Sequence, residues 1–526
     1  MKGILFYNGQ IYNMYQSAVY DWLLIREGRI AAVGSKKDRP FLQGIQSAAD
    51  LQGRVVIPAF IDAHMHLIFS ALAHFRVQLK GCISLSQALQ SLKQYAAHAN
   101  KNDWIQGGGF NRNTWRDAIP HRRYLDDIFP NNPVALYSVD MHSLWVNTRA
   151  LQISGLFNTT KTVTSGKIDR DKDGLPSGLL YEDAMKPVLD KIPSLTISEV
   201  KQALNKFYPY LYKLGITAVH TMENFADFNL LRRIHKEKEL GIRSTVYIYQ
   251  QDMHELINEK LISYQGDEWL RLGGVKLFTD GSLGSRTAHL FQPYEGEPEN
   301  YGVEVTGDEE LYAILREAAE HRLAAAVHAI GDRAVSKVID VFSRLKNVYT
   351  KNNLVARIEH VQLIKPEDIR HIARLGAVAS VQPVHIADDV YLAEQYWGKR
   401  SAYAYAFRPL IEAGVSLAFG SDSPVADPDP LKGIFSAVHR RFALDINNPI
   451  WQPQLAIDAF EAIKAYTQGS ARAARQQLVR GGLQPGKQAD FVVLSDNPFK
   501  AGAEELLSIR VMMTVQNGSI VYSEES

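Results

Sequence analysis

The sequence predicts an α/β fold: a (β/α)8 TIM-type barrel, a small β-sandwich domain built from both termini, and a subdomain inserted after the first barrel strand. Three observations predict it. Eight short apolar runs alternate with helical periodicity through the middle of the chain, which is typical of parallel βα units. Short alternating runs occupy both ends of the chain. Residues 75–205 are far longer than a connection between two barrel strands requires.

The two ends of the chain have the pattern of short strands. Near the N-terminus they cover 3–12, 19–26 and 29–33, with Asn8-Gly9 and Glu27-Gly28 as turn signals. Near the C-terminus they cover 490–494, 511–515 and 519–522, with Asn517-Gly518 between the last two. We therefore expect residues 1–55 and 478–526 to form one composite β-sandwich domain, which would tie down both termini.

The middle of the chain has the pattern of a parallel barrel. Buried strands are expected at 54–61, 215–220, 243–249, 274–278, 324–328, 356–360, 377–382 and 415–420. Helices are expected at 308–322, 366–375 and 456–477. The barrel then covers residues 56–477, and residues 75–205 form a subdomain over its mouth with strands at 104–108 and 134–139.

A rival division has two doubly wound domains joined near Pro193. It would need a glycine-rich phosphate turn directly after a strand. Gly107-Gly108-Gly109 follows an apolar pair, but no G-x-G-x-x-G pattern continues from it. The barrel is therefore favoured.

The composition limits the class of protein. Of the 526 residues, 46% are hydrophobic, which is enough for a large core. The net charge of +1 gives no electrostatic reason to expect nucleic acid or an anionic membrane as a partner. The single cysteine, Cys82, excludes an intramolecular disulfide. With no secretory leader or membrane span in its pattern, the chain is expected to be soluble and cytoplasmic.

The strongest local pattern is His64-Met65-His66, just after the first apolar run. Residues two apart in a strand point the same way, so both imidazoles would project together as zinc ligands. In a chain with 16 histidines such a pair is weak evidence alone. Its position strengthens the prediction, because active sites of this fold lie at the C-terminal ends of the strands.

Four other strand ends carry polar residues where a structural core would have Val, Ile or Leu. They present Lys276, His328, His360 and Asp422. Each has a structural alternative: a hydrogen-bonded core histidine, a lysine paired with a carboxylate such as Asp280, or a carboxylate that caps a helix. Their recurrence at the catalytic face predicts a metal centre.

These segments resemble the amidohydrolase superfamily, and specifically the YtcJ-like branch of amidohydrolase family 3, which includes N-substituted formamide deformylases. The resemblance covers nearly the whole chain. It rests on the first-strand motif at 55–66 and on the segments 140–147, 178–182, 274–286, 328–332 and 420–424. Ala59 stands where the family usually has Gly, and no effect on metal coordination is expected.

The resemblance implies six metal ligands: His64, His66, Lys276, His328, His360 and Asp422. The first two would bind one divalent metal and the histidines of strands five and six a second. Lys276 would carry a carboxylate derived from carbon dioxide and bridge the two. Zinc is the expected metal, with one or two ions per chain, although iron, manganese or cobalt would also fit these ligands.

The implied function is hydrolysis of a C–N bond, in an amide or an N-substituted formamide, by a metal-activated water. Asp422 would be the general base and then the general acid. Three alternatives stay open: a deaminase with one metal, a cyclic amidase, and a barrel kept as a non-catalytic binding or regulatory protein. Deaminases of the superfamily have a glutamate three residues after the fifth-strand histidine, where this chain has Gly331.

Residues in the insert and in the strand-end loops are candidates for contact with a small-molecule substrate: Trp115, His142, Tyr181, Glu182, His220 and Arg286. The apolar and aromatic content of residues 104–145 favours an aryl or alkyl amide over a highly charged substrate. We expect no nucleic-acid or membrane partner. A homodimer is expected from family habit alone.

Overall fold

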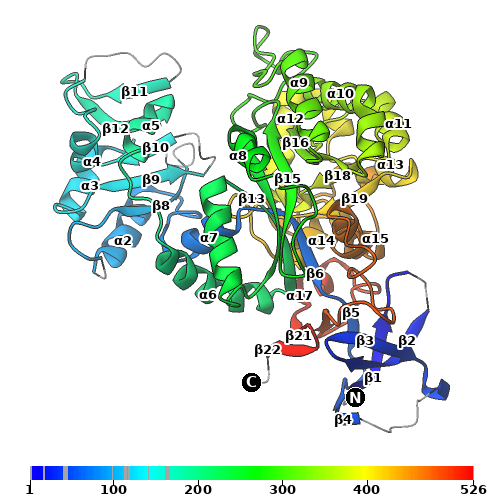
Figure 1. Cartoon of the computed structure of the whole chain (residues 1–526). Helices are drawn as coiled ribbons and strands as arrows, with labels where there is room; N and C mark the ends of the chain where they lie inside the picture. Colours follow the sequence, from blue (N-terminus) through cyan, green and yellow to red (C-terminus); the bar gives the residue numbers. More distant parts are fainter. Residues whose placement is uncertain are drawn as a thin grey trace. The chain divides into compact units, whose positions relative to one another are not determined.

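The structure is a computed structural model that describes residues 3–15, 18–38, 45–97, 99–111, 115, 119–139, 141, 143–159 and 166–524. The chain forms two compact units (Figure 1). One contains Met1–Leu67 and Asn205–Ser526, and the other contains Ile68–Leu204. No helix among the described residues is long and apolar enough to cross a bilayer.

An eight-stranded parallel sheet forms a barrel in the first unit. In chain order its strands are β6 (Phe60–Met65), β13 (Ile216–Glu223), β14 (Arg243–Tyr249), β15 (Leu270–Phe278), β16 (Ala325–Ala329), β17 (Ala356–His360), β18 (Val378–Val381) and β19 (Ser416–Phe419). The last strand returns to the first, because Asp422 N donates to His64 O at 2.6 Å and His66 N donates to Ser423 O at 2.9 Å. The predicted fold class is confirmed, and the doubly wound rival is wrong.

The first predicted strand, 54–61, is wrong in one respect, because the chain changes sheets within it. Residues Val55–Pro58 form β5 of the terminal sheet, and β6 begins at Phe60. At the junction Ala59 N donates to Asp490 O, and Phe60 N donates to Gly215 O, both at 3.0 Å. An unbroken apolar run hides this change, because both strands are buried on both faces.

Helices follow the barrel strands and lie on the outside of the barrel (Figure 1). They are α6 (Ile197–Lys213, which begins in the second unit), α7 (Phe225–Lys236), α8 (Met253–Asn258), α9 (Asp308–Glu320), α10 (Asp332–Lys351), α11 (Pro366–Leu375), α12 (Ile386–Trp397), α13 (Phe407–Glu412) and α14 (Pro430–His439). In α10 the buried residues Val335, Val338, Phe342 and Leu345 recur every three or four positions, as an amphipathic helix requires.

The helix predicted at 456–477 is interrupted. It consists of α15 (Ala459–Lys464), a π-helical turn at Ala465–Gly469, and α16 (Ser470–Ala473). At Gly469 an added Cβ would lie 1.8 Å from Leu417 O, so only glycine allows this turn to approach β19 so closely. The turn therefore follows from packing against the barrel, which the helical periodicity does not reveal.

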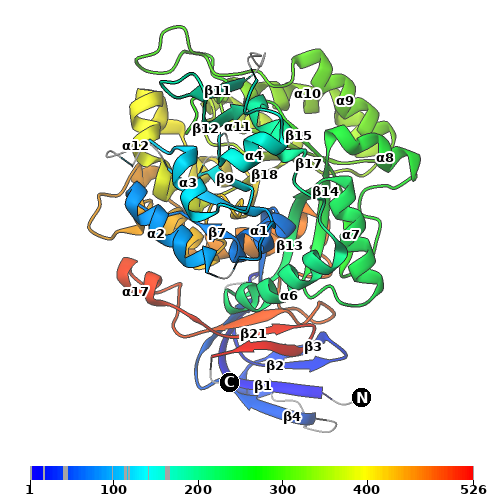
Figure 2. The same cartoon turned by 90° about the vertical axis from the view of Figure 1, so that its left-hand side faces the viewer.

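Strands from both termini form one sheet beside the barrel (Figure 2), and its N-terminal and C-terminal parts meet where residues 491–494 pair with 55–58. Its strands are β1 (Gly3–Tyr12), β2 (Val19–Arg26), β3 (Arg29–Gly34), β4 (Ile45–Asp50), β5, β20 (Phe491–Leu494), β21 (Val511–Gln516) and β22 (Ser519–Ser523). Phe6, Ile25, Val56, Phe491 and Val515 contribute to its apolar core. Asn8-Gly9 lies at an irregularity inside β1, not at a hairpin turn.

The second unit contains a six-stranded sheet in the order β11-β12-β10-β9-β8-β7. Its strands are β7 (Val77–Gln78), β8 (Ile105–Phe110), β9 (Val134–Ser138), β10 (Ser143–Val146), β11 (Gly166–Arg170) and β12 (Pro176–Glu182). Its helices are α1 (Leu67–Phe75, which begins in the first unit), α2 (Leu85–Ala96), α3 (Arg122–Ile128), α4 (Thr148–Ile153) and α5 (Lys186–Leu189). Alternate residues of β10 enter two apolar clusters, Trp145 one and Leu144 the other, as the strand period of two requires.

Candidate metal centre

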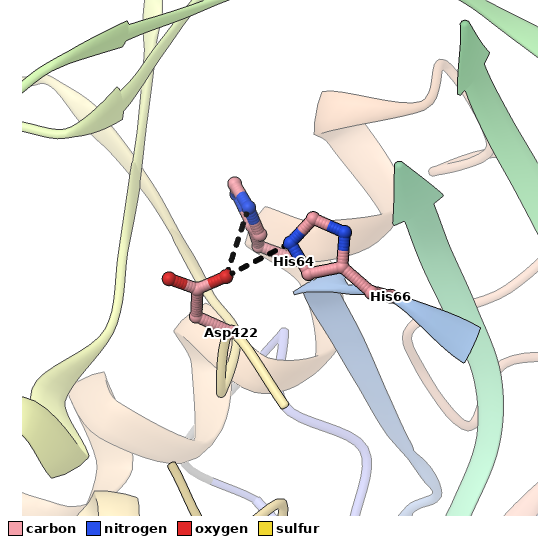
Figure 3. Close-up of side chains that lie close together, drawn as sticks. All are labelled: His64, His66 and Asp422. Atoms are coloured by element: carbon pink, nitrogen blue, oxygen red, sulfur yellow. Dashed lines mark ion pairs between the residues drawn. The ribbon is translucent and has the colours of Figure 1, made fainter. Parts of the chain in front are cut away.

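The end of the first barrel strand meets the segment after the last one at three side chains (Figure 3). Oδ1 of Asp422 lies 3.4 Å from Nε2 of His64 and 3.3 Å from Nε2 of His66. Two ligand atoms that each lie about 2.0–2.1 Å from a tetrahedral zinc ion are about 3.4 Å apart. The three side chains are therefore spaced as ligands of one divalent ion.

The neighbouring strand ends add a second pair of histidines. The ring centroid of His360 lies 4.5 Å from that of His328 and 5.0 Å from that of His64. His360 and Asp422 both have left-handed backbone, with φ of 72° and 60°. This conformation is costly for side chains other than glycine and is concentrated at functional sites.

Both histidines of the first strand use Nδ1 for a protein partner. In His64 this atom lies 2.6 Å from Oε2 of Glu359. In His66 it lies 3.2 Å from the carbonyl oxygen of Met222 and 3.1 Å from the hydroxyl of Tyr249. The acceptors on Nδ1 favour the tautomer in which Nε2 of each ring, the atom that faces Asp422, can bind a metal.

In the second pair of histidines each ring also has one nitrogen on a protein acceptor, but the two rings use different nitrogens. Nδ1 of His360 lies 2.7 Å from Oε1 of Gln382, and Nε2 of His328 lies 3.0 Å from the carbonyl oxygen of Gly281. Each ring keeps its other nitrogen available. The Nζ of Lys276 is buried and has no hydrogen-bond partner among the described residues. Burial of an amine without a hydrogen-bond partner costs free energy, because its hydration is lost. A carboxylate on Nζ would replace the amine with oxygen atoms that a metal ion could bind.

The electrostatics of the site suit metal binding. Burial, with a further contribution from Lys276, lowers the pKa of His64 to about 4 and of His328 to about 3, so both are neutral at pH 7. Burial lowers the pKa of Lys276 to about 8. Burial acts to raise the pKa of Asp422, but His64 and His66 outweigh it and keep that pKa well below its usual value. Neutral imidazoles and an ionised carboxylate are the forms that bind metals.

Sequence reasoning missed the residues that support these side chains. Glu359 holds His64, and its other oxygen contacts the guanidinium of Arg357. Asp62, which is also buried, accepts hydrogen bonds from the backbone N of His64 at 3.0 Å and from the hydroxyl of Ser421 at 2.5 Å. A usable signal was present for one pair, because Arg357 and Glu359 are two apart in a predicted buried strand and share a face.

Two predicted substrate residues of the barrel have protein partners. His220 is buried, and its Nδ1 accepts from Nη1 of Arg357 at 2.9 Å. Arg286 forms an ion pair of 2.8 Å with Glu297 and lies over the ring of Tyr396. Neither contact tests whether these side chains meet a substrate, so both stay predictions.

The other predicted substrate residues belong to the second unit. Trp115 is buried in its core, where Nε1 donates to the carbonyl oxygen of Cys82 at 2.8 Å. Tyr181 and Glu182 are the last two residues of β12, and the ring of Tyr181 lies 5.9 Å from Nζ of Lys167. His142 lies outside the described residues. Contact of these four residues with a substrate also stays a prediction.

Comparisons with known proteins give a family match and relatives that cover nearly the whole chain. Residues 48–522 match the amidohydrolase family. YtcJ of Bacillus subtilis is 33% identical over 537 residues, which cover 100% of both chains. The N-substituted formamide deformylase of Arthrobacter pascens is 25% identical, over 95% of this chain and 94% of that one. An uncharacterized metal-dependent hydrolase of Pyrococcus horikoshii superimposes with a TM-score of 0.81 and 28% identity, over 96% of this chain and 99% of the other.

Proposed function

The chain belongs to the amidohydrolase family, and from this premise we propose that it hydrolyses the C–N bond of an amide or an N-substituted formamide. The observation that carries the proposal is the spacing of His64, His66 and Asp422, which fits one divalent ion. Lys276, His328 and His360 would hold a second ion beside it. Zinc is proposed because imidazole and carboxylate are common zinc ligands.

Divalent ions at these positions would lower the pKa of a water and polarise the carbonyl of the substrate. The protein supplies the proton transfer. Asp422 is ionised, and its Oδ1 lies within 3.4 Å of Nε2 of His64 and of His66. Its carboxylate can therefore accept a proton from the attacking water. The same carboxyl can then donate that proton to the departing nitrogen, as a general base that becomes a general acid.

Lys276 is suited to carboxylation. With a pKa of about 8, roughly one tenth of the amines are neutral at pH 7, whereas an ordinary lysine is almost wholly protonated. A neutral Nζ attacks carbon dioxide, an N–C bond forms, and one proton is released to solvent. The product carries one negative charge on two oxygens, so the carboxylated side chain could ligate cations, which a plain ammonium cannot do.

A deaminase is disfavoured by the backbone after β16. Gly331 occupies the position where deaminases of the superfamily have a glutamate, and its N donates to Oδ2 of Asp280 at 2.8 Å. An added Cβ at residue 331 would lie 2.1 Å from the carbonyl oxygen of His289. The local packing therefore leaves no room for any side chain at this position.

The test is a screen of the zinc-loaded protein against N-substituted formamides, simple amides, cyclic amides and an aminopurine. We expect hydrolysis of the C–N bond in one of the first three classes, with activity lost after chelation and restored by zinc. Full activity in the metal-stripped protein would contradict the proposal. So would hydrolysis of no amide beside rapid deamination of the aminopurine.

A further inference from the structure

Strand β17 carries two buried charges directly before a predicted metal ligand. Arg357 and Glu359 are 1% and 0% exposed, and His360 follows them. Oε2 of Glu359 lies 2.6 Å from Nδ1 of His64, and its other oxygen contacts Nε of Arg357. A strand that supplies one ligand thus also holds the ring of another ligand from a different strand.

Arg357 links this carboxylate to three other barrel strands. Its Nη2 donates to the hydroxyl of Ser380 at 2.9 Å and to the carbonyl oxygen of Ala63, the residue before His64. Its Nη1 donates to Nδ1 of His220 at 2.9 Å. The guanidinium therefore fixes both the carboxylate that holds the His64 ring and the backbone from which that ring projects.

Stability alone does not explain the pair. Two buried charges lose their hydration, and apolar residues of similar volume often pack at least as well in their place. The pair gives His64 a different kind of Nδ1 partner from that of His360. The Nδ1 of His360 meets a neutral amide oxygen, that of Gln382, whereas the Nδ1 of His64 meets a carboxylate. A carboxylate acceptor makes the imidazole a more basic, better oriented ligand.

We propose that Arg357 and Glu359 are positioning residues that fix His64 with Nδ1 protonated and Nε2 aimed at the metal. In consequence the position at His64, His66 and Asp422 binds a divalent ion more tightly than the position at His328 and His360. The proposal rests on the metal centre of the proposed function. At low metal concentration, the first ion should therefore bind at His64, His66 and Asp422.

The experiment titrates the metal-free full chain with zinc against a competing chelator. Wild type should bind two equivalents, the first more tightly. Glu359→Gln should weaken the tighter step by about 10–100-fold, the usual effect of losing an outer partner of a metal ligand. Gln382→Met, the matched variant on the other side, should weaken only the other step.

Crystals grown with one equivalent of zinc locate the ion by anomalous scattering. In wild type the peak should lie among His64, His66 and Asp422. In Glu359→Gln it should move to His328 and His360. Because this variant leaves the Arg357 charge without an ionised partner, the double variant Arg357→Met, Glu359→Gln removes both charges and should show the same shift.

The outcomes distinguish a failure of the positioning role from a failure of the metal centre itself. Zinc affinities in the folded double variant equal to those of wild type would overturn the positioning role, as would equal weakening of both steps. Wild type that binds no zinc at these residues would instead overturn the proposed function.

Discussion

Strands β5 and β6 are separated by one residue, yet only β6 buries ionisable side chains. β5 contributes Val55, Val56 and Ile57 to the terminal sheet. β6 carries Asp62 and His64 into the barrel, where both are 1% exposed. Burial of apolar side chains stabilises the folded chain, whereas burial of ionisable groups costs free energy unless each is paired.

The difference separates the part of the chain that provides stability from the part that provides chemistry. In the terminal sheet the buried residues form a large apolar cluster, and the polar side chains that β21 buries, Thr514 and Gln516, are uncharged. At the barrel mouth Lys276 is buried without a hydrogen-bond partner among the described residues, and His360 and Asp422 have strained backbone. Such costs persist where the surrounding structure imposes them for function. Substitutions in the two regions should therefore have opposite signatures.

The largest effect on activity is expected at Asp422. Asp422→Asn keeps the shape of the side chain but removes the carboxylate that would accept the proton, so kcat should fall by about 10²–10⁴-fold. The kinetics would use the amide or formamide identified by the screen. Thermal unfolding should show a folded protein. A kcat within a few fold of wild type would show that Asp422 is not the base.

In the terminal sheet the expected signature is reversed. Phe491 is fully buried, and its ring packs edge-on against Phe6 at 5.1 Å. Phe491→Ala should lower the free energy of unfolding by about 3–5 kcal/mol, because it leaves a cavity in an apolar core. Urea unfolding measures the loss. The kcat per folded molecule should equal that of wild type, and a large fall in kcat would break the comparison.

Lys276→Met should stabilise the metal-free protein while it abolishes activity. Folding lowers the pKa of Lys276 from 10.5 to about 8, which corresponds to a cost of about 3 kcal/mol. The cost is complete below pH 8, because both the folded and the unfolded chain are protonated there, and it disappears as the pH rises to 10.5. The gain in stability should therefore be largest near pH 7 and absent above pH 10.5.

Urea unfolding of the metal-free protein across this pH range measures that gain. Lys276→Arg is the matched control, because it keeps a buried positive charge and should show no gain. A destabilised Lys276→Met protein at pH 7 would contradict the view that this lysine is retained for chemistry.

The smallest effect is expected at Tyr249. Its hydroxyl lies 3.1 Å from Nδ1 of His66, but the carbonyl oxygen of Met222 occupies the same nitrogen at 3.2 Å. Tyr249→Phe removes only one of two acceptors, so zinc affinity should fall by about 10-fold or less. A chelator competition measures it. A loss of 100-fold would show that the hydroxyl, not the carbonyl, orients His66.

The sequence was informative where one pattern has one structural meaning. The barrel strands were predictable because each is a short apolar run, and α11 matches its predicted bounds at Pro366 and Leu375. The change of sheet at Ala59 was not predictable, because the same apolar residues suit both sheets. The π-helical turn at Ala465–Gly469 follows from packing against β19, which no local periodicity encodes.

The candidate site shows the same limit. Its strand-end residues could be named in advance because the barrel places strand ends together. Apart from Glu359, their partners could not be named in advance, since Gln382 and Tyr249 differ from ordinary polar residues only through the histidines they meet. Which nitrogen of each ring is engaged depends on three-dimensional contacts alone.

Anomalous diffraction from crystals saturated with zinc tests the central claim most directly. Two peaks are expected: one within bonding distance of His64, His66 and Asp422, and one beside His328 and His360. Density for a carboxylate on Lys276 should connect them. Zinc bound elsewhere on the chain, with none at the paired histidines, would contradict the account.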